Sequence, residues 1–392
     1  MALTLDGTNG IVSSGSITTQ SATGVIFSDS SSLPAASSPY VLKNRIINGA
    51  MVIDQRNAGA SYNVQGGEYS VDRWATNATQ TSKFSAQQNA GSVTPPTGYS
   101  YYLGLTSTAA TTVGASDIFN IAQYIEGFNF ADLNWGTANA QTVTISFWVR
   151  SSLTGTFGGA LTNSGVTRSY PFSYTISAAN TWEQKTITIT GDTTGTWVGA
   201  TNGIGVRTYF SLGTGSTRAT TAGAWAAGDY RTATGATNVV STNGATFYIT
   251  GVQLEIGSTA TPFERRLYNQ ELANCQRYYY RIYPNENSRT LSTSGQAYST
   301  TGFIATFQFP VPMRSRPTAL EQSGTATHYA AWGAGTNAIA CNSVIVYNSS
   351  TTNFLSVVEG TVASGLVAGN ATSINTSAST GSNAYLGWSA EL

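Results

Sequence analysis

The sequence predicts an all-β protein: an N-terminal arm, a jelly-roll-like β-sandwich, one short connecting helix and a C-terminal β-sandwich. Polar and apolar residues alternate along short segments that are separated by turn residues, as expected for strands with one buried face. The 392 residues include 41 glycines. Only 9% are charged, against about 25% in an average soluble protein. A helical pattern is convincing in a single segment, near residues 261–282.

Residues 1–42 are predicted to form an arm. Strand-like pieces such as LTLDG and GVIFSD precede the Ser/Ala/Pro stretch SSSLPAASSPY. Such a segment buries too little apolar surface to stay ordered alone, so we expect sister chains or a partner to hold it. The first residues lack the basic start and apolar core of a signal peptide, and no run reaches transmembrane length. These features predict synthesis in a cytoplasm without an export signal.

Residues 43–257 alternate as strands of a jelly-roll-like sandwich. In QTVTISFWVRSS, the residues Val143, Ile145, Phe147 and Val149 share one face, and Trp148 falls on the other. In NGATFYITGVQLEIG the apolar phase changes at Thr250–Gly251, which predicts a β-bulge. Many short strands joined by Gly, Asn and Ser turns favour two packed sheets.

Residues 258–284 are predicted to connect two β domains through a helix. Thr261-Pro262-Phe263-Glu264 has the form of a capping box with proline at the first helical position. Beyond it runs a narrow apolar stripe with heptad-like spacing: Tyr268, Leu272, Cys275, Tyr279 and Ile282. The stripe either packs on the chain's own β domain, with Arg265 and Arg266 paired to carboxylates, or joins three copies of the chain.

Residues 285–392 are predicted to form a second β-sandwich and a candidate receptor-binding tip. In TGFIATFQFPVPM, the residues Phe303, Ala305, Phe307 and Phe309 share one face until Pro310 interrupts the strand. NSVIVYNSS, NFLSVVEGTV and AYLGWSAEL supply further strands. The block is long enough for a domain of its own.

Charge and motif content argue against nucleic acid, membrane insertion and cofactors. The chain has 18 basic and 18 acidic residues, and neither sign forms a block. No nucleotide-binding loop or Cys/His zinc motif occurs. Cys275 and Cys341 are expected to be buried free thiols, with a disulfide between them as the alternative.

Catalysis is poorly supplied, so the prediction is a protein that is not an enzyme. His328 is the sole histidine and has no evident catalytic partner. The enzymatic alternative is a glycan depolymerase with two carboxylates about 5–9.5 Å apart. Its eligible acids are Asp72, Asp117, Glu126, Asp132, Glu183 and Asp229. Asp72 and Arg73 look like a local ion pair, and the solenoid repeat of a long β-helix is missing.

Aromatic residues favour binding of sugars. The chain has 8 Trp and 21 Tyr, and aromatic rings stack on the apolar faces of sugars while amides and hydroxyls bond to sugar hydroxyls. For each aromatic residue the competing interpretation is packing in a core or an interface. The candidate contacts with a glycan or partner are Trp148, Trp182, Trp197, Tyr329, Trp332, Tyr385 and Trp388.

Several segments resemble recurring parts of bacteriophage tail-fibre and related virion proteins. They are NRIINGAMVIDQRN (44–57), YSVDRW (69–74), ITGVQLEIGSTATPFERR with ELANCQRYYYR (249–281), the ending AYLGWSAEL and the arm itself. In those proteins a jelly-roll module similar to carbohydrate-binding modules leads through a helix into a terminal β domain. The resemblance implies trimers, attachment to the virion by the N-terminus and host contact by distal domains.

Together these features predict a phage virion fibre protein, a tail fibre, that attaches to host cell-surface glycan as a homotrimer. Its expected partners are its own copies, other virion proteins through the arm, and host polysaccharide. One alternative is a purely structural virion component, such as a capsid fibre, decoration protein or tail adaptor. The depolymerase is the second alternative.

Overall fold

The computed structural model describes residues 43–284, 289–292, 294–333, 338–347, 350–377 and 384–392, together with the backbone of two short strands near the N-terminus. The chain divides into two units, Met1–Lys43 and Asn44–Leu392. In the first unit, β1 (Val25–Ile26) and β2 (Ser32–Leu33) form an antiparallel pair. The rest of the predicted arm, residues 1–42, lies outside the described residues.

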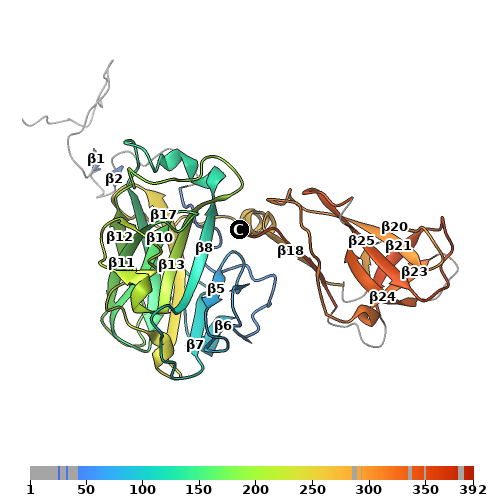
Figure 1. The fold of residues 1–392 in the computed structure, drawn as a ribbon, viewed down its shortest axis with the longest axis horizontal. Helices are drawn as coiled ribbons and strands as arrows, with labels where there is room; N and C mark the ends of the chain where they lie inside the picture. Colours follow the sequence, from blue (N-terminus) through green and yellow to red (C-terminus); the bar gives the residue numbers. More distant parts are fainter. Residues whose placement is uncertain are drawn as a thin grey trace, which may run out of the picture. The chain divides into compact units, whose positions relative to one another are not determined.

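Two antiparallel sheets pack into a sandwich in the first part of the second unit (Figure 1). The seven-stranded sheet contains, in spatial order, β15 (Ala226–Ala227), β11 (Arg168–Ile176), β10 (Gly155–Thr162), β13 (Ile204–Thr214), β8 (Ile118–Glu126), β5 (Ala75–Ala78) and β4 (Glu68–Tyr69). The six-stranded sheet contains β12 (Glu183–Ile189), β9 (Val143–Ser151), β17 (Thr246–Ile256), β7 (Leu103–Ser107), β6 (Phe84–Gln88) and β3 (Tyr62–Asn63). A short parallel pair is formed by β14 (Ala219–Thr220) and β16 (Thr232–Ala233).

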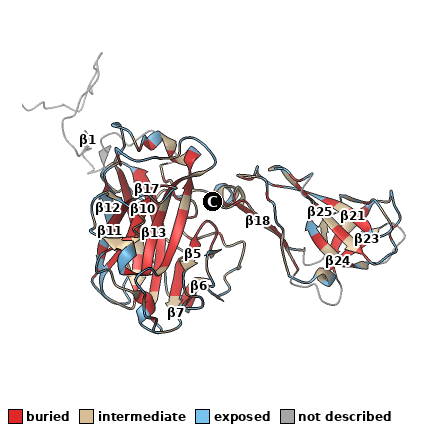
Figure 2. Cartoon of the chain, viewed as in Figure 1, coloured by how far each residue is buried: buried red, intermediate tan, exposed pale blue. Residues whose placement is uncertain are grey.

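The strand phases read from the sequence are the phases of the sandwich core. Val143, Ile145, Phe147 and Val149 are fully buried between the sheets, and Figure 2 shows the buried residues running along the central strands. The pairing of β17 with β9 shifts register between Thr250 and Gln253, which confirms the predicted bulge. Gly251 adopts a φ of 62° there, a conformation that glycine tolerates better than other residues.

A second β body with its own core follows. Its seven-stranded sheet contains, in spatial order, β19 (Thr290–Ser292), β26 (Thr372–Thr376), β23 (Tyr329–Gly333), β24 (Ile339–Val346), β25 (Leu355–Val362), β21 (Gly302–Gln308) and β20 (Gly295–Ala297). Its three-stranded sheet contains β18 (Tyr279–Ile282), β27 (Leu386–Ser389) and β22 (Glu321–Gln322). Phe303, Ala305, Phe307 and Phe309 all face this core, as their alternation predicts.

The predicted helix of residues 261–282 is wrong in its extent. Helix α1 covers only Tyr268–Gln276, and its N-cap, Leu267, makes no side-chain capping bond. The expected capping residues are engaged elsewhere: the Thr261 hydroxyl donates to Glu255, and the Glu264 carboxylate accepts from the Asn44 amide. The chain returns to strand at Tyr279 because β18 pairs with β27.

The all-β prediction is confirmed, since α1 is the one α-helix in the described part of the chain. Single-turn 3₁₀ helices lie at η1 (Ala90–Ser92), η2 (Gly127–Asn129), η3 (Ala131–Leu133), η4 (Ser216–Arg218), η5 (Val239–Ser241) and η6 (Ala326–His328). Within the described residues, no helix combines the length and the apolar character needed to cross a membrane.

Candidate functional site

A polar hollow of about 240 Å³ lies on the outer face of the sandwich's seven-stranded sheet, the sheet that contains β8 and β13. We call it the sheet-face pocket. The inward residues of β8 and β13 fill the sandwich core, so the alternate residues of both strands face outward. The residues that line the sheet-face pocket are Gly66, Gly67, Asn77, Ala78, Thr79, Ile118, Asn120, Tyr124, Arg207, Tyr209 and Arg231.

Strand register brings the functional side chains of the pocket together. Arg207 on β13 pairs with Tyr124 on β8, and Asn120 on β8 pairs with Asn77 on β5. Side chains directly opposite on one face of an antiparallel pair lie close enough to interact. Three strands that are distant in the sequence therefore place two amides, a phenol and a guanidinium in one hollow.

Two tyrosine rings and two arginines form the wall of the pocket. The rings of Tyr124 and Tyr209 meet edge to face, with centroids 6.4 Å apart. The guanidinium carbon of Arg207 lies 5.3 Å from the Tyr124 centroid, and that of Arg231 lies 4.2 Å from the Tyr209 centroid. Both distances fall within the range of cation–π attraction. Asp229 forms an ion pair with Arg231 and fixes its position.

Several buried polar atoms of the pocket have no hydrogen-bond partner among the described residues. They are Asn120 Nδ2, Arg207 Nε and the Tyr209 hydroxyl. Asn120 and Tyr209 are fully buried. The Asn120 Oδ1 accepts a bond from Asn77 at 2.9 Å, which directs its Nδ2 elsewhere. Leaving buried polar atoms unpaired costs free energy, so a ligand that pairs them gains affinity.

Burial and neighbouring groups together set the protonation of the pocket wall. Burial raises the pKa of Tyr124, with the neighbouring Tyr209 acting in the same direction, so this phenol stays protonated at neutral pH. Burial acts to lower the pKa of Arg231, but Tyr209 and Asp229 outweigh it, and the net pKa is raised. The wall therefore offers a neutral hydroxyl and a permanent cation.

A second hollow of about 400 Å³ offers less chemistry. It lies beside β14 and β16 and is lined by glycine, alanine, serine, threonine, valine and asparagine alone. Binding sites for small molecules ordinarily combine apolar or aromatic walls with a few placed polar groups. Of these two hollows, both formed by described residues, the sheet-face pocket is the one that combines aromatic rings, charge and unpaired donors.

The aromatic candidates of the first domain contribute mainly to packing. Trp182 packs edge to face on Tyr102 and donates its indole N–H to the Thr94 carbonyl at 2.9 Å. Trp197 belongs to an edge-to-face cluster with Trp135 and Trp225. Trp148 is half-buried on the outward side of β9. None of these three lines the sheet-face pocket.

The prediction that four aromatic residues of the last domain form a contact surface is wrong for two of them. Tyr329 and Trp388 are fully buried, and Trp388 packs between Tyr280 and Phe309 in the core. Tyr385 is half-buried beneath the guanidinium of Arg281, 3.7 Å from its ring centroid. Trp332 alone is largely exposed, at 53% of its surface.

The apolar stripe of the predicted helix does not form one surface. Cys275 is fully buried within α1, whereas Tyr279 and Ile282 lie on β18. Leu272 is half-buried, and Tyr268 is 63% exposed beside the exposed Leu267. Cys275 and Tyr279 are therefore committed to their own chain, and Tyr268 remains available to another.

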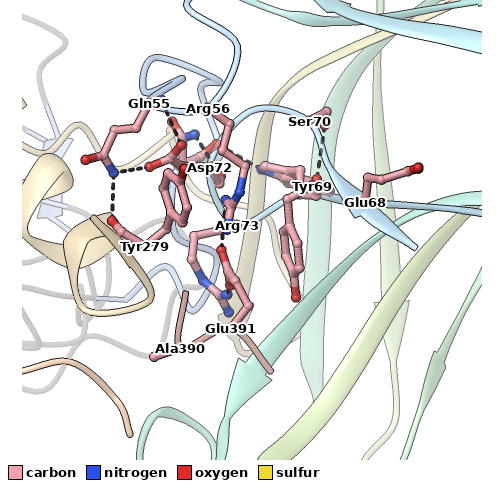
Figure 3. A network of polar contacts seen from close by, with 12 residues as sticks. Gln55, Arg56, Glu68, Tyr69, Ser70, Asp72, Arg73, Tyr279, Ala390 and Glu391 are labelled. Atoms are coloured by element: carbon pink, nitrogen blue, oxygen red, sulfur yellow. Dashed lines mark hydrogen bonds and ion pairs between the residues drawn. The ribbon is translucent and has the colours of Figure 1, made fainter. Parts of the chain in front are cut away.

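A polar network joins the sandwich to the segment after it (Figure 3). The Gln55 side-chain amide donates to both the Asp72 carboxylate and the Tyr279 carbonyl. Arg73 pairs with Glu391 rather than with Asp72, so the predicted local ion pair is wrong. The guanidinium of Arg56 stacks 3.5 Å from the Tyr279 ring centroid.

A buried carboxylate on the sandwich's seven-stranded sheet also holds the connecting segment, residues 258–284, which we call the joint. Glu126, at the end of β8, accepts bonds from Arg277 Nε at 2.9 Å and Nη2 at 2.6 Å. The Tyr278 hydroxyl donates to it at 2.6 Å. Nearby, Arg266 pairs with Glu264 and Glu271. The charged residues that concentrate near positions 255–281 thus fasten the chain that leaves the sandwich.

The other acids considered for catalysis also have structural contacts. Asp132 pairs with Arg45, Glu183 with Lys185, and Asp229 with Arg218 and Arg231. Asp117 accepts bonds from Thr79, Gln80 and the Gly114 amide. His328 lies 2.9 Å from the Ser323 hydroxyl through its Nδ1.

Both cysteines are free and buried, as predicted. Burial raises the pKa of Cys341 to about 12 and raises that of Cys275 as well. Thiols with such raised pKa values are poor nucleophiles at neutral pH. Groups of His, Cys, Asp and Glu that could hold a metal ion are not found among the described residues.

None of the residues that line the sheet-face pocket is among the site residues predicted from the sequence. The signal was present in their phase: Asn120 and Tyr124 alternate with the apolar residues of β8, and Arg207 and Tyr209 do so on β13. Their meeting depends on a register that shifts near both ends of the β13–β8 pairing. Strand pairing of this kind is not readable from alternation alone.

Comparison with known proteins gives structural similarities only. No protein-family model matches the sequence, and no curated protein matches it. The enzymatically active domain of tailspike protein 4 of bacteriophage CBA120 matches at 12% identity and a TM-score of 0.29, covering 56% of this chain and 22% of that one. This chain therefore spans less than a quarter of the tailspike domain.

Carbohydrate-binding modules also match. The family 11 module of Clostridium thermocellum, solved with a β-1,3-1,4-mixed-linked tetrasaccharide, matches at 14% identity and a TM-score of 0.27, covering 52% of this chain and 99% of that one. The module TmCBM61, solved with β-1,4-galactotriose, matches at 11% identity and a TM-score of 0.26, covering 49% and 92%.

Proposed function

We propose that this protein is a glycan-binding fibre protein of a bacteriophage virion and that it holds its glycan in the sheet-face pocket. The observation that carries the proposal is the set of unpaired donors at Asn120, Arg207 and Tyr209, gathered beside two aromatic rings. Amide, phenol and guanidinium groups pair readily with sugar oxygens. This placement differs from the sequence-based expectation, in which the last domain makes the contact.

The virion assignment rests on the segments that resemble phage fibre proteins. Contacts within this chain support treating them as one structural unit. The Asn44 carboxamide bonds to Val252 and Leu254, and the Asn48 amide donates to Glu271. Segments 44–57, 69–74 and 249–281 thus meet at the joint where the chain leaves the sandwich.

Attachment by a homotrimer is part of the same proposal. A single pocket of this size is expected to bind one sugar weakly, near millimolar affinity or about 4 kcal/mol. Three copies on one fibre, and several fibres on one particle, raise the avidity without any new contact. The N-terminal arm, residues 1–42, is assigned to attachment within the virion.

The protein is proposed to bind the glycan without cleaving it. A glycosidase needs two carboxylates that flank the scissile bond. In the described residues the six candidate acids are held by arginine, lysine, amide or hydroxyl partners, and none of them lines the sheet-face pocket. A depolymerase would have to use a different arrangement.

A glycan panel tests the proposal. The full chain is applied to immobilised bacterial surface polysaccharides, in parallel with Arg207→Gln and the matched control Arg150→Gln. Arg150 lies over a tyrosine ring and bonds a backbone carbonyl, as Arg207 does, but on the other sheet. We expect retention on one class of glycan, weakened roughly tenfold or more by Arg207→Gln alone.

Three results would contradict parts of the proposal. Absence of binding across the panel favours the structural virion component. If Arg207→Gln and Arg150→Gln lose the same amount of glycan affinity, binding does not depend on the sheet-face pocket. Release of defined oligosaccharides from the bound polysaccharide favours the depolymerase. Locating the labelled protein in an intact virion tests the assignment to a fibre.

A further inference from the structure

The unpaired groups of the sheet-face pocket share one chemical property. Asn120 Nδ2 and Arg207 Nε can only donate hydrogen bonds, and the Tyr209 hydroxyl can donate as well. None of the three unpaired atoms is an oxygen that can only accept. The complementary ligand group is therefore rich in acceptors and needs no donor of its own.

The charged residues of the pocket also favour a ligand group that is rich in hydrogen-bond acceptors. Its lining includes Arg207 and Arg231 and no acidic residue. Asp229 pairs with Arg231 and also with Arg218, an arginine outside the lining, so two guanidinium groups share its carboxylate. This concentration is unusual in a chain whose charged residues amount to 9% and whose net charge is zero.

Two further carboxylates lie next to the lining and are already occupied. Glu68 accepts bonds from the Gln65 and Gly66 amides at 3.0 Å. Asp117 accepts from Thr79 at 2.8 Å and from Gln80 at 2.6 Å. Neither carboxylate belongs to the lining of the pocket.

The aromatic rings are not free platforms for a neutral sugar. The guanidinium groups of Arg207 and Arg231 lie over the rings of Tyr124 and Tyr209. A sugar that enters the pocket therefore meets guanidinium and amide N–H groups as well as ring edges. Charge-assisted hydrogen bonds to a guanidinium are about twice as strong as neutral ones.

The volume limits the ligand further. At about 240 Å³, the pocket is smaller than the roughly 300–1,000 Å³ of sites that enclose drug-sized molecules. It suits one sugar residue with its charged substituent, while the rest of a polysaccharide would continue outside.

We infer that the sheet-face pocket recognises a carboxylate-bearing sugar, a uronate residue of an acidic polysaccharide. The carboxylate accepts bonds from Arg207 Nε and Asn120 Nδ2, and the Tyr209 hydroxyl donates to the same group or to a ring oxygen. The inference rests on the proposed function and adds the chemical class of the glycan.

Binding of matched acidic and neutral sugars tests the inference. The probes are short oligosaccharides of galacturonate, mannuronate, guluronate and glucuronate, together with their methyl esters, which keep the ring and remove the charge. Affinity for the full chain is measured by titration calorimetry at neutral pH. We expect at least one uronate to bind roughly tenfold or more tightly than its ester.

Variants assign that preference to the pocket. Arg207→Gln should reduce the acid-over-ester ratio toward one, and Arg207→Lys should restore part of it because the charge returns without the planar fork. Arg150→Gln, which lies outside the pocket, should leave the ratio unchanged. Thermal unfolding of each variant without ligand verifies that it is folded.

The outcomes separate this inference from the proposed function. If neutral glycans bind through Arg207 and uronates have no advantage, the proposed function stands and the inference is overturned. If uronates bind equally well to wild type and Arg207→Gln, the acidic site lies elsewhere. If no glycan binds at all, both proposals fail.

Discussion

Arg207 lies directly opposite Tyr124 in the pairing of β13 with β8, and its guanidinium carbon is 5.3 Å from the tyrosine ring centroid. One Nη of Arg207 donates to the Ser164 carbonyl at 2.8 Å, while its Nε has no partner among the described residues. The side chain is therefore held by one end and unsatisfied at the other. This arrangement suits a residue that is preorganised for a ligand.

Removal of the Tyr209 hydroxyl is expected to weaken glycan binding while leaving the stability of the fold nearly unchanged. It is buried without a partner, so Tyr209→Phe should change the free energy of unfolding by less than about 1 kcal/mol. The same change removes a donor from the pocket and should weaken glycan affinity about tenfold. Chemical denaturation and titration calorimetry measure the two effects.

Tyr174 supplies the matched control for this experiment. Its hydroxyl is also buried without a partner among the described residues, but its ring packs in the sandwich core, away from the pocket. Tyr174→Phe should leave glycan affinity unchanged. Equal affinities for wild type and Tyr209→Phe would remove this hydroxyl from the binding site.

The joint should depend on the ion pair between Glu126 and Arg277. Arg277→Met leaves the buried Glu126 carboxylate with a hydrogen bond from the Tyr278 hydroxyl and with Arg314 as a nearby positive charge. Breaking a buried pair costs about 3–5 kcal/mol, and since a third of Arg277 is exposed we expect a loss of about 2 kcal/mol. Urea denaturation monitored by tryptophan fluorescence measures it.

The control for the joint is Arg265→Met. Arg265 lies 4.9 Å from the Tyr99 ring centroid, is exposed, and belongs to the same segment. A change at an exposed position is expected to stay within about 0.5 kcal/mol. A loss as large as that of Arg277→Met would show that any charge in the segment suffices.

Asp72 should make stability depend on pH. Burial raises the pKa of its carboxyl to about 6, despite opposing contributions from Arg56 and Gln55. The folded chain therefore holds this proton more tightly than the unfolded chain, so the free energy of unfolding falls as pH rises toward 6 and then levels off. Asp72→Asn removes this term. Variant minus wild-type stability should rise by about 2 kcal/mol between pH 4 and pH 7.

Asp192 gives the opposite sign and a useful control. Burial acts to raise its pKa, but hydrogen bonds from Arg168 and Thr194 outweigh burial and lower the net pKa. Its contribution is present above the unfolded pKa and is lost only as pH falls through the lower folded value. The stability difference of Asp192→Asn should stay nearly flat from pH 4 to pH 7. A flat curve for Asp72→Asn would contradict the account of Asp72.

The exposed pair Leu267 and Tyr268 tests the proposed trimer. Both are large apolar residues exposed at the start of α1, at 74% and 63% of their surfaces. Replacing both by serine should leave the monomer's stability nearly unchanged, since neither is buried. If this pair joins copies of the chain, light scattering should show a mass near three times 41.1 kDa for wild type and a smaller mass for the variant. A 41.1 kDa wild type at all concentrations would contradict the trimer.

Period-two alternation made most of the strands predictable from sequence. β9 and β21 place their apolar residues in the cores, and the phase change at Thr250 is a bulge. The start of the helix was harder to predict. Thr261 and Glu264 match a capping box, but they bond to Glu255 and Asn44 instead. Local pattern cannot reveal a competing partner that lies 220 residues away.

The site itself could not be predicted because it depends on pairing between distant strands. Trp388 looks like a surface aromatic in AYLGWSAEL, yet β27 pairs with β18 and buries it against Phe309. Conversely, Arg207 and Asn120 look like ordinary outward residues until the pairing of β13 with β8 places them in one hollow. Register is set by turns and bulges that alternation does not encode.

The most direct test of the account is an experimental structure of the full chain with the tightest-binding oligosaccharide from the panel. We predict a sugar residue in the sheet-face pocket, with its oxygens about 2.7–3.2 Å from Asn120 Nδ2, Arg207 Nε and the Tyr209 hydroxyl. A sugar bound at Trp332 or elsewhere on the last domain, with the pocket free of ligand, would contradict it.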